Sequence, residues 1–368
     1  MRRMFATLTT ALLGLALAAS GCESSKSAEK EAESKASKAS KEARAEGKKQ
    51  KAEMAKKKEK MKKLMKKMMK ADKSKMPADK NVSATVTQPE GKVTYWVPPG
   101  PRELGDHFGT KDNPKFTGKK KIQNAPPPVK KVLKKHPILV GAPPKARKYK
   151  NGKAIFAQPT PFSDKGVPVK QGSLDLTYID RRSADKKGPP IKTPDEVKAS
   201  ISFTDPDGNS YKLKPLLTFQ PPIPGYKTQG GVMTDDYHHG ATGTGSPLMP
   251  KVYTWGAFWA IGNVVVNGEV ANKHQVMHCM TTETVRDKNY HLTLNSEMPL
   301  KKSNTIAGQM HHTHCIVLPI KFTPTGPVNS PVNTAFELPN GKKQPFIHIM
   351  YENDKLGDGP SWNGPSGN

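Results

Sequence analysis

The sequence predicts an all-β protein, namely an antiparallel β-sandwich, or two smaller sandwiches fused near residue 230, that follows a charged and partly helical N-terminal tether. From residue 172 onward, short segments with alternating apolar and polar side chains recur between turn-forming residues. That alternation is typical of half-buried strands. No convincing helical pattern follows residue 80. Residues 23–80, by contrast, are almost entirely Lys, Ala, Glu, Ser and Met, a composition that cannot bury a core.

The first 21 residues predict an export signal. Arg2 and Arg3 precede an apolar run at 11–19, which is too short to span a membrane. The following Ala19-Ser20-Gly21-Cys22 resembles the lipobox of bacterial lipoproteins, with Ala19 where Leu is commoner. The resemblance implies cleavage before Cys22 and attachment of lipid to that cysteine, which would anchor the chain in the bacterial cell envelope. Glu23 after the lipid site implies, by the same resemblance, the outer membrane. The alternative is a simple cleaved signal.

Residues 22–80 are predicted to be a tether that contains an amphipathic basic helix near 54–72. Methionines and one leucine recur at helical spacing through Met61–Lys70, and lysines fill the other positions. Such a helix could lie on anionic lipid or lipopolysaccharide, capture copper(I) through its thioethers, or act as a spacer. The net charge of +28 favours anionic partners. The export signal argues against nucleic acid as that partner.

The remaining chain divides by composition into a Pro-rich extended segment at 81–171, the β-sandwich region at 172–356 and a flexible Gly/Pro/Asn-rich tail at 357–368. Within the sandwich region, Thr204–Ser210 is a strong hairpin-turn signal and Asn267-Gly268 is another. Asp235–His239 is predicted to be a loop. Strands are predicted at 173–179, 197–203, 211–219, 255–261, 264–266, 274–283, 291–294, 312–322 and 345–352.

Two cysteines, Cys279 and Cys315, remain if Cys22 carries lipid. In an oxidising compartment such a pair favours a disulfide, which would close a loop of about 36 residues and stabilise the fold by about 3–4 kcal/mol. The competing interpretation is metal ligation by the thiolates, and one cysteine cannot do both.

Histidines gather in the C-terminal half of the chain. His311, His312 and His314 stand beside Cys315 at the start of an apolar strand. Because successive strand residues point to opposite faces, His312 and His314 share one face, while His311 and Cys315 share the other. The same alternation places further possible ligands together on neighbouring segments, namely His278 with Met280, and His348 with Met350.

If these strands are neighbours, His278, His312, His314, His348 and Met350 could converge on one metal ion. Imidazole with thioether suits copper, whereas imidazoles alone would equally suit zinc. His312-Thr313-His314 followed by His348-Ile-Met350-Tyr351 resembles the His, His, Met copper site of the copper type II monooxygenases. Those enzymes also use β-sandwich domains and place an adjacent histidine pair at a second copper. The resemblance would give that part to His238-His239, although the order and spacing depart from the family and its disulfide framework is absent.

Two function classes follow. The first is an envelope-anchored lipoprotein that binds copper or zinc, for metal handling or for redox chemistry; as an enzyme it would be a copper-dependent oxidoreductase. The second is a non-catalytic lipoprotein whose disulfide-stapled sandwich docks an envelope polymer or a partner protein, with the histidines in purely structural roles. Gly243-Thr-Gly-Ser-Pro247 lacks the spacing of a nucleophile elbow, which argues against a serine hydrolase.

Overall fold

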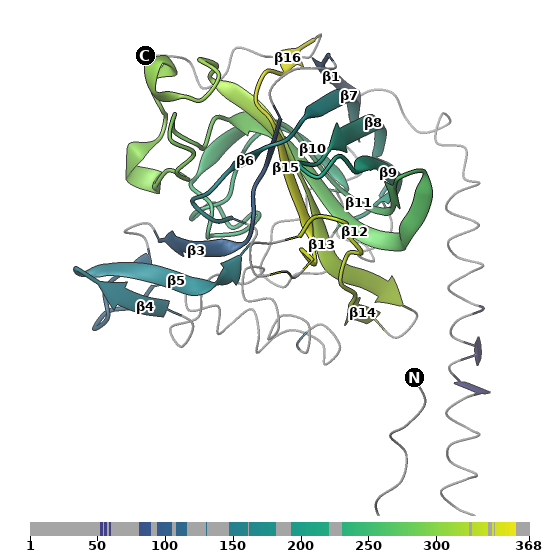
Figure 1. Cartoon of the computed structure of the whole chain (residues 1–368), viewed down its shortest axis with the longest axis horizontal. Helices are drawn as coiled ribbons and strands as arrows, with labels where there is room; N and C mark the ends of the chain where they lie inside the picture. The colour runs from purple at the N-terminus through teal and green to yellow at the C-terminus, as the bar shows by residue number, and fades with distance from the viewer. Residues whose placement is uncertain are drawn as a thin grey trace, which may run out of the picture. The chain divides into compact units, whose positions relative to one another are not determined.

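We describe a computed structural model of the 368-residue chain (Figure 1). The structure describes residues 81–89, 94–104, 108–115, 147–160, 162–181, 193–220, 230–323, 326–337 and 343–357, with single residues at 52, 53, 55, 56, 59, 130 and 341. The predicted export signal, Cys22, most of the predicted tether and amphipathic helix, and the tail beyond residue 357 lie outside these ranges. No helix among the described residues is long and apolar enough to cross a bilayer.

One large antiparallel sheet of thirteen strands forms the body of the protein, in the order β16-β1-β7-β8-β9-β11-β12-β13-β15-β2-β6, with β10 beside β11 and β14 beside β13. Its strands are β1 (Asn81–Gln88), β2 (Thr94–Trp96), β6 (Val167–Pro168), β7 (Gln171–Arg181), β8 (Glu196–Thr204), β9 (Ser210–Thr218), β10 (Val232–His238), β11 (Val252–Val266), β12 (Glu269–Glu283), β13 (His311–Thr323), β14 (Gly326–Asn329), β15 (Ile347–Tyr351) and β16 (Lys355–Leu356). A second sheet holds β3 (Gly100–Glu103), β5 (Lys153–Thr160) and β4 (Arg147–Lys150). The all-β antiparallel prediction is therefore confirmed.

The long hairpin of β11 and β12 positions the strands that carry most of the histidines. Asn267 and Gly268 connect the two strands with φ values of 50° and 88°, the left-handed conformations that a two-residue hairpin turn requires. The two 15-residue strands pair along almost their whole length, with bulges near Thr254 and Gly262. β12 then pairs with β13, and β13 with β15, so three segments far apart in sequence lie side by side.

The main sheet curls on itself into a half-barrel, and each of its faces is buried in a different cluster (Figure 1). The inner face of β11, β12, β13 and β15 packs against β1, β7, β8 and β9 around aromatic residues such as Trp96, Phe203 and Tyr211. The outer face packs against the β3–β5–β4 sheet and several loops, including Phe156, Phe162 and Leu248. A strand covered on both faces buries residues of either parity, which explains why β12 is buried at every position from Gln275 to Glu283.

Four predictions differ from the structure. No boundary occurs near residue 230, because β9 pairs with β11 across it in one continuous sheet. The segment 81–171 contains β1 and β2, which pair with β7 and β15, so residue 172 does not mark where the sheet begins. β10 (Val232–His238) replaces the expected loop at Asp235–His239, since β11 gives it a partner. The strand at 291–294 is only an isolated bridge, Arg286 to Leu292.

Candidate metal centre

The register of three neighbouring strands brings the predicted ligands to one face of the sheet. On β12, β13 and β15, Met280 lies opposite His314, which lies opposite Met350. One step along, His278 and His348 flank Ile316 on either side. His312 lies opposite Thr282 on the same face. Because directly opposed residues of an antiparallel pair share a face, this outer face carries all five predicted residues, His278, His312, His314, His348 and Met350.

Two further histidines reach the same face from outside the strand trio. His238 ends β10, and His239 follows it with a φ of 64°, an uncommon backbone conformation for a residue with a side chain. The loop after them returns over both rings at Gly245, whose φ is 65°. A Cβ atom built there would lie 2.4 Å from His239 Nδ1 and 2.9 Å from His238 Cδ2. Only glycine therefore lets this loop close over the histidine pair.

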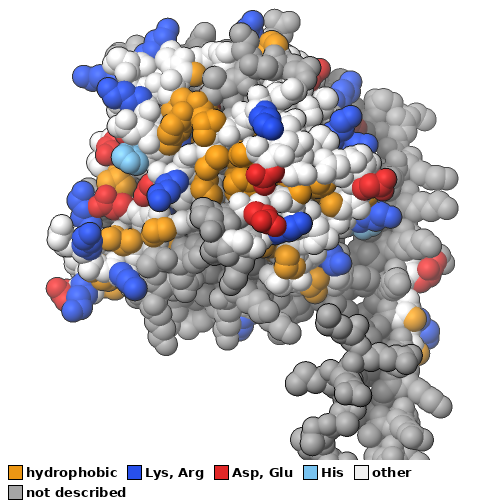
Figure 2. Space-filling view, viewed as in Figure 1, with side chains coloured by type: hydrophobic (Ala, Val, Ile, Leu, Met, Phe, Trp, Pro, Cys, Tyr) orange, Lys and Arg blue, Asp and Glu red, His pale blue; other side chains and the backbone are white. Residues whose placement is uncertain are grey.

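We call these side chains the histidine face: His238, His239, His278, His312, His314 and His348, with Met280 and Met350. Each of the eight is at most 5% exposed. The surface shown in Figure 2 accordingly displays scattered Lys and Arg side chains among small apolar areas, and hardly any histidine. Buried imidazoles without surface access need a structural or a ligand-binding explanation.

His239 has its proton on the nitrogen that points away from the face. Its Nδ1 lies 3.1 Å from the carbonyl oxygen of Ser246, and a carbonyl can only accept, so Nδ1 carries the N–H. Nε2 then presents a lone pair, and it lies 3.0 Å from Met280 Sδ, which is also an acceptor. In the neutral ring no proton lies between these two atoms. Two lone pairs facing each other at this distance are the arrangement that a shared cation would stabilise.

His278 and His312 are oriented in the same sense. Nδ1 of His278 donates to the carbonyl oxygen of Phe258 at 2.8 Å, and its ring stacks on Trp259 at 4.0 Å between centroids. Nδ1 of His312 lies 3.2 Å from Glu352 Oε2, a buried carboxylate. The Nε2 atoms of both rings have no hydrogen-bond partner in the described part of the chain. Metal-binding histidines usually donate one ring N–H to a carbonyl or carboxylate, which fixes the ring so that the other nitrogen can bind the ion.

Burial favours the neutral form of four imidazoles of this face, those of His238, His239, His278 and His314. Loss of hydration, with His278 as a further cause, lowers the pKa of His239 to about 3. The same loss of hydration lowers the pKa of His278 to about 4, although its bond to Phe258 opposes the shift. The pKa values of His238 and His314 also lie well below the ordinary value, first through burial and then through neighbouring histidines. Neutral imidazole is the form that binds metals.

The distances between the ring centroids of neighbouring histidines are close to those in a metal site. Two imidazoles that share one ion at about 2.0 Å have ring centroids about 5 Å apart. The observed separations are 5.3 Å for His238 and His239, 5.7 Å for His312 and His314, and 5.4 Å for His314 and His348. No three His, Cys, Asp or Glu side chains of the described residues already surround a common point. The close pairs here are two imidazoles, or one imidazole with a thioether, so binding would need small side-chain rotations.

The other histidines do not join the face. His311 points to the opposite side, where Nδ1 lies 2.8 Å from Asp354 Oδ1. His274 is exposed on β12, and His291 is an exposed partner of Asp287. His107 and His136 lie outside the described residues. Sequence alternation could therefore select the strand histidines, whereas only the resemblance to copper type II monooxygenases pointed to His238 and His239, in a segment predicted to be a loop. The signal that could have found them is the glycine-rich segment that follows.

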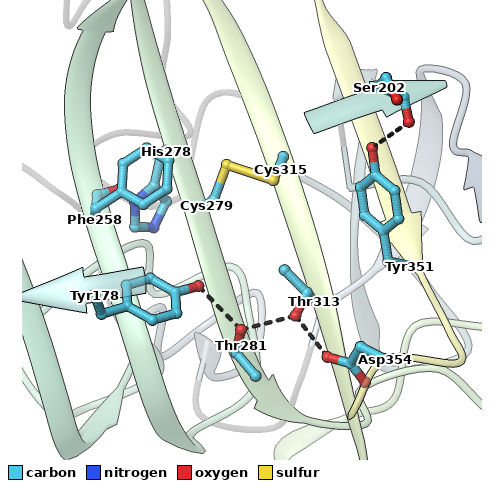
Figure 3. Close-up of a disulfide and its surroundings, with 10 residues drawn as sticks. All are labelled: Tyr178, Ser202, Phe258, His278, Cys279, Thr281, Thr313, Cys315, Tyr351 and Asp354. Carbon is cyan, nitrogen blue, oxygen red and sulfur yellow. Dashed lines mark hydrogen bonds between the residues drawn. A yellow bond between two sulfur atoms is a disulfide. The ribbon is translucent and has the colours of Figure 1, made fainter. Parts of the chain in front are cut away.

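The two cysteines form a disulfide on the inner face, so the alternative of thiolate ligation is wrong. Cys279 and Cys315 are directly opposed on β12 and β13, with 4.0 Å between their Cα atoms. Figure 3 shows the bond beside a buried chain of hydrogen bonds that runs from the Tyr178 hydroxyl through Thr281 and Thr313 to Asp354. The disulfide thus ties together the two central strands that carry the histidine face on their other side.

Comparison with protein families, curated proteins and solved structures found no match for this chain.

Proposed function

We propose that this protein binds a transition-metal ion, with copper preferred over zinc, at the histidine face. The contact between His239 Nε2 and Met280 Sδ carries the proposal, because it brings two lone-pair donors to 3.0 Å with no proton between them. Ligand atoms bound to one ion at about 2.0–2.3 Å lie about 3–3.6 Å apart, depending on the angle at the ion. His314 lies directly opposite Met280 on β13, where its imidazole could complete the set.

The thioethers favour copper. Met280 and Met350 are fully buried on the face, on either side of His314. Sulfur without charge is a soft ligand, and imidazole is a borderline one, a combination that suits copper in both of its common oxidation states. Zinc binds imidazole equally well but is not redox-active, and its protein sites use thiolate rather than thioether sulfur. When bound, copper would give the protein a centre that can gain and lose one electron.

The face is long enough to offer two groups of donors. His238, His239 and His278 with Met280 lie toward β10, while His312, His314 and His348 with Met350 lie toward β15. An adjacent histidine pair near a His-x-His and Met set is the arrangement that the resemblance to copper type II monooxygenases implies. This supports redox chemistry as the finer proposal, with storage or delivery of copper as the alternative. Residues such as Glu352 and Phe258 would hold the ring orientations in either case.

The cellular setting is also a proposal. Cleavage before Cys22 and lipidation of that residue would anchor the chain to a bacterial envelope membrane, in agreement with the disulfide, which forms in oxidising compartments. The basic helix of Met61–Lys70 would then lie near anionic lipid or lipopolysaccharide. In this setting a metal bound at the face would remain attached to the membrane.

Elemental analysis of the purified mature chain tests the metal proposal. We expect about one equivalent of copper or more, lost in the double variant His312→Ala/His314→Ala. Met280→Leu keeps an apolar side chain of similar volume, so it should weaken copper(I) binding and leave zinc binding nearly unchanged. His274→Ala, on an exposed residue, is the matched control.

Metal-free protein whose melting temperature does not change on adding copper or zinc would contradict the proposal, because a ligand that binds only the folded state must stabilise it. That result would favour the second function class, a disulfide-stapled module that docks an envelope polymer or a partner protein.

A further inference from the structure

In the part of the chain that the structure describes, two buried arginines have unpartnered hydrogen-bond donors and also no carboxylate at ion-pair distance. Arg102, on β3, is 2% exposed, and Arg286, just after β12, is 0% exposed. Arg102 donates from Nε to the carbonyl oxygen of Glu103, and Arg286 donates from Nη1 to that of Tyr290. Within the described structure, Arg102 Nη1 and both Nε and Nη2 of Arg286 lack any partner. Native proteins leave few buried donors without a hydrogen-bond partner. Three such nitrogen atoms on two guanidinium groups therefore need an explanation.

Neither guanidinium group has a carboxylate at ion-pair distance in the described part of the chain, where the ion pairs involve other side chains. Burial lowers the pKa of Arg102 and of Arg286 to about 10. Asp164 opposes the shift at both arginines from beyond ion-pair distance, Glu352 and Asp287 also oppose it at Arg286, and Arg286 adds to the shift at Arg102. Two buried like charges with no carboxylate at ion-pair distance are a costly arrangement without a further anion.

The two arginines lie beside the histidine face. The ring of Tyr290, whose carbonyl oxygen holds Arg286, packs against Tyr95 at 4.7 Å between centroids. Tyr95 is directly opposite Met350 on the neighbouring strand. On the other side, Asp164 Oδ2 accepts a hydrogen bond from the backbone N–H of Glu103, next to Arg102. Segments from β3, the loop after β12 and the loop before β6 thus meet at the Met350 end of the face.

We propose that Arg102 and Arg286 form a binding site for the oxyanion of a small molecule, a carboxylate or a phosphate group. Guanidinium groups present forked N–H donors that match these oxyanions, and hydrogen bonds between charged partners are the strongest of their kind. A bound oxyanion would satisfy the three orphan donors and neutralise the pair of buried charges. The site does not depend on metal at the histidine face, although its position would place an anionic ligand next to that face.

Isothermal titration of the full mature chain with inorganic phosphate and with acetate, at constant ionic strength set by chloride, tests the site. We expect saturable binding of at least one of the two anions, and the stronger one identifies the class of headgroup. Arg286→Met and Arg102→Met should each lower the affinity about tenfold or more, because each removes charge-assisted hydrogen bonds. Arg181→Met is the matched control, since this buried arginine also has an unpartnered Nε but its charge is paired with Glu196 and its Nη1 donates to the carbonyl oxygen of Pro194.

A second readout separates the proposal from a structural role. Without added anion, Arg286→Met should be as stable as the parent protein or more stable, since it removes a buried charge that lacks a partner. If the methionine variants fail to fold, Arg286→Lys can be used instead. Lysine keeps the positive charge but lacks the forked N–H donors of a guanidinium group, so this variant should still weaken anion binding. Absence of saturable binding of both anions to the parent protein, or binding unchanged in every folded arginine variant, would overturn the proposal.

Discussion

Acid should destabilise the metal-free protein strongly, because its folded state keeps histidines neutral that protonate when the chain unfolds. The pKa of His239 is lowered to about 3 and that of His278 to about 4, from an ordinary value of 6.5. Above pH 6.5 both residues are neutral in both states, and this contribution is constant. Below pH 6.5 the unfolded chain takes up protons that the folded protein does not, so stability falls with pH.

The magnitude follows from the two pKa values. Between pH 6.5 and the folded pKa, each residue costs about 1.4 kcal/mol of unfolding free energy per pH unit. Lowering the pH from about 7.5 to about 5 therefore costs about 2 kcal/mol for each residue, or about 4 kcal/mol for the two. His238 and His314, whose pKa values are also lowered, would add to this loss. Domains of ordinary stability have about 5–15 kcal/mol in total.

Urea denaturation of metal-free protein at the two pH values measures the effect. His278→Gln should reduce the difference between the two pH values by about 2 kcal/mol, whereas His274→Gln, on an exposed residue, should leave it unchanged. Unfolding free energies that agree within about 1 kcal/mol at the two pH values would refute the reasoning. So would an equal pH dependence of the parent protein and the His278→Gln variant.

Three further predictions concern the frame and the anchor. Replacing Cys279 and Cys315 by alanine should lower the unfolding free energy by about 4 kcal/mol in chemical denaturation, from the closure entropy of a loop with a sequence separation of 36; a loss below about 1 kcal/mol would mean that the bond does not stabilise the fold. Gly245→Ala should abolish copper binding in a titration, whereas Gly268→Ala, with a similar positive φ but open space around it, should keep it; equal affinities would contradict the closed loop. Cys22→Ser should move the protein from the membrane fraction to the soluble fraction on immunoblots, and retention in the membrane would exclude the lipid anchor.

The grouping of the strand-borne ligand candidates could be predicted because strand alternation has a period of two. The common face of His278, His312 and His314 follows from a single assumption, that their strands are neighbours. Antiparallel pairing then places the three side chains on one side of the sheet. The disulfide between Cys279 and Cys315 could be predicted because only these two cysteines remain once Cys22 is assigned to lipid. Local pattern was sufficient wherever turn residues marked the strand ends, as at Asn267-Gly268.

What could not be predicted depends on long-range contacts. The membership of β1 in the sheet rests on pairing with β7, about ninety residues later along the chain, and nothing in its Pro-rich surroundings signals it. His239 joins the face through a positive φ and a loop that Gly245 allows to close. Arg102 and Arg286 are single basic residues among many in a chain of net charge +28. Only burial with unpartnered donors and no carboxylate at ion-pair distance distinguishes these two side chains.

Anomalous diffraction from crystals of the copper-soaked full chain, recorded above the copper absorption edge, tests the central proposal most directly. We predict a strong peak on the histidine face, within about 2–2.5 Å of His239 Nε2 and Met280 Sδ. A peak only at exposed residues such as His274 or His291, with none on the histidine face, would contradict the account.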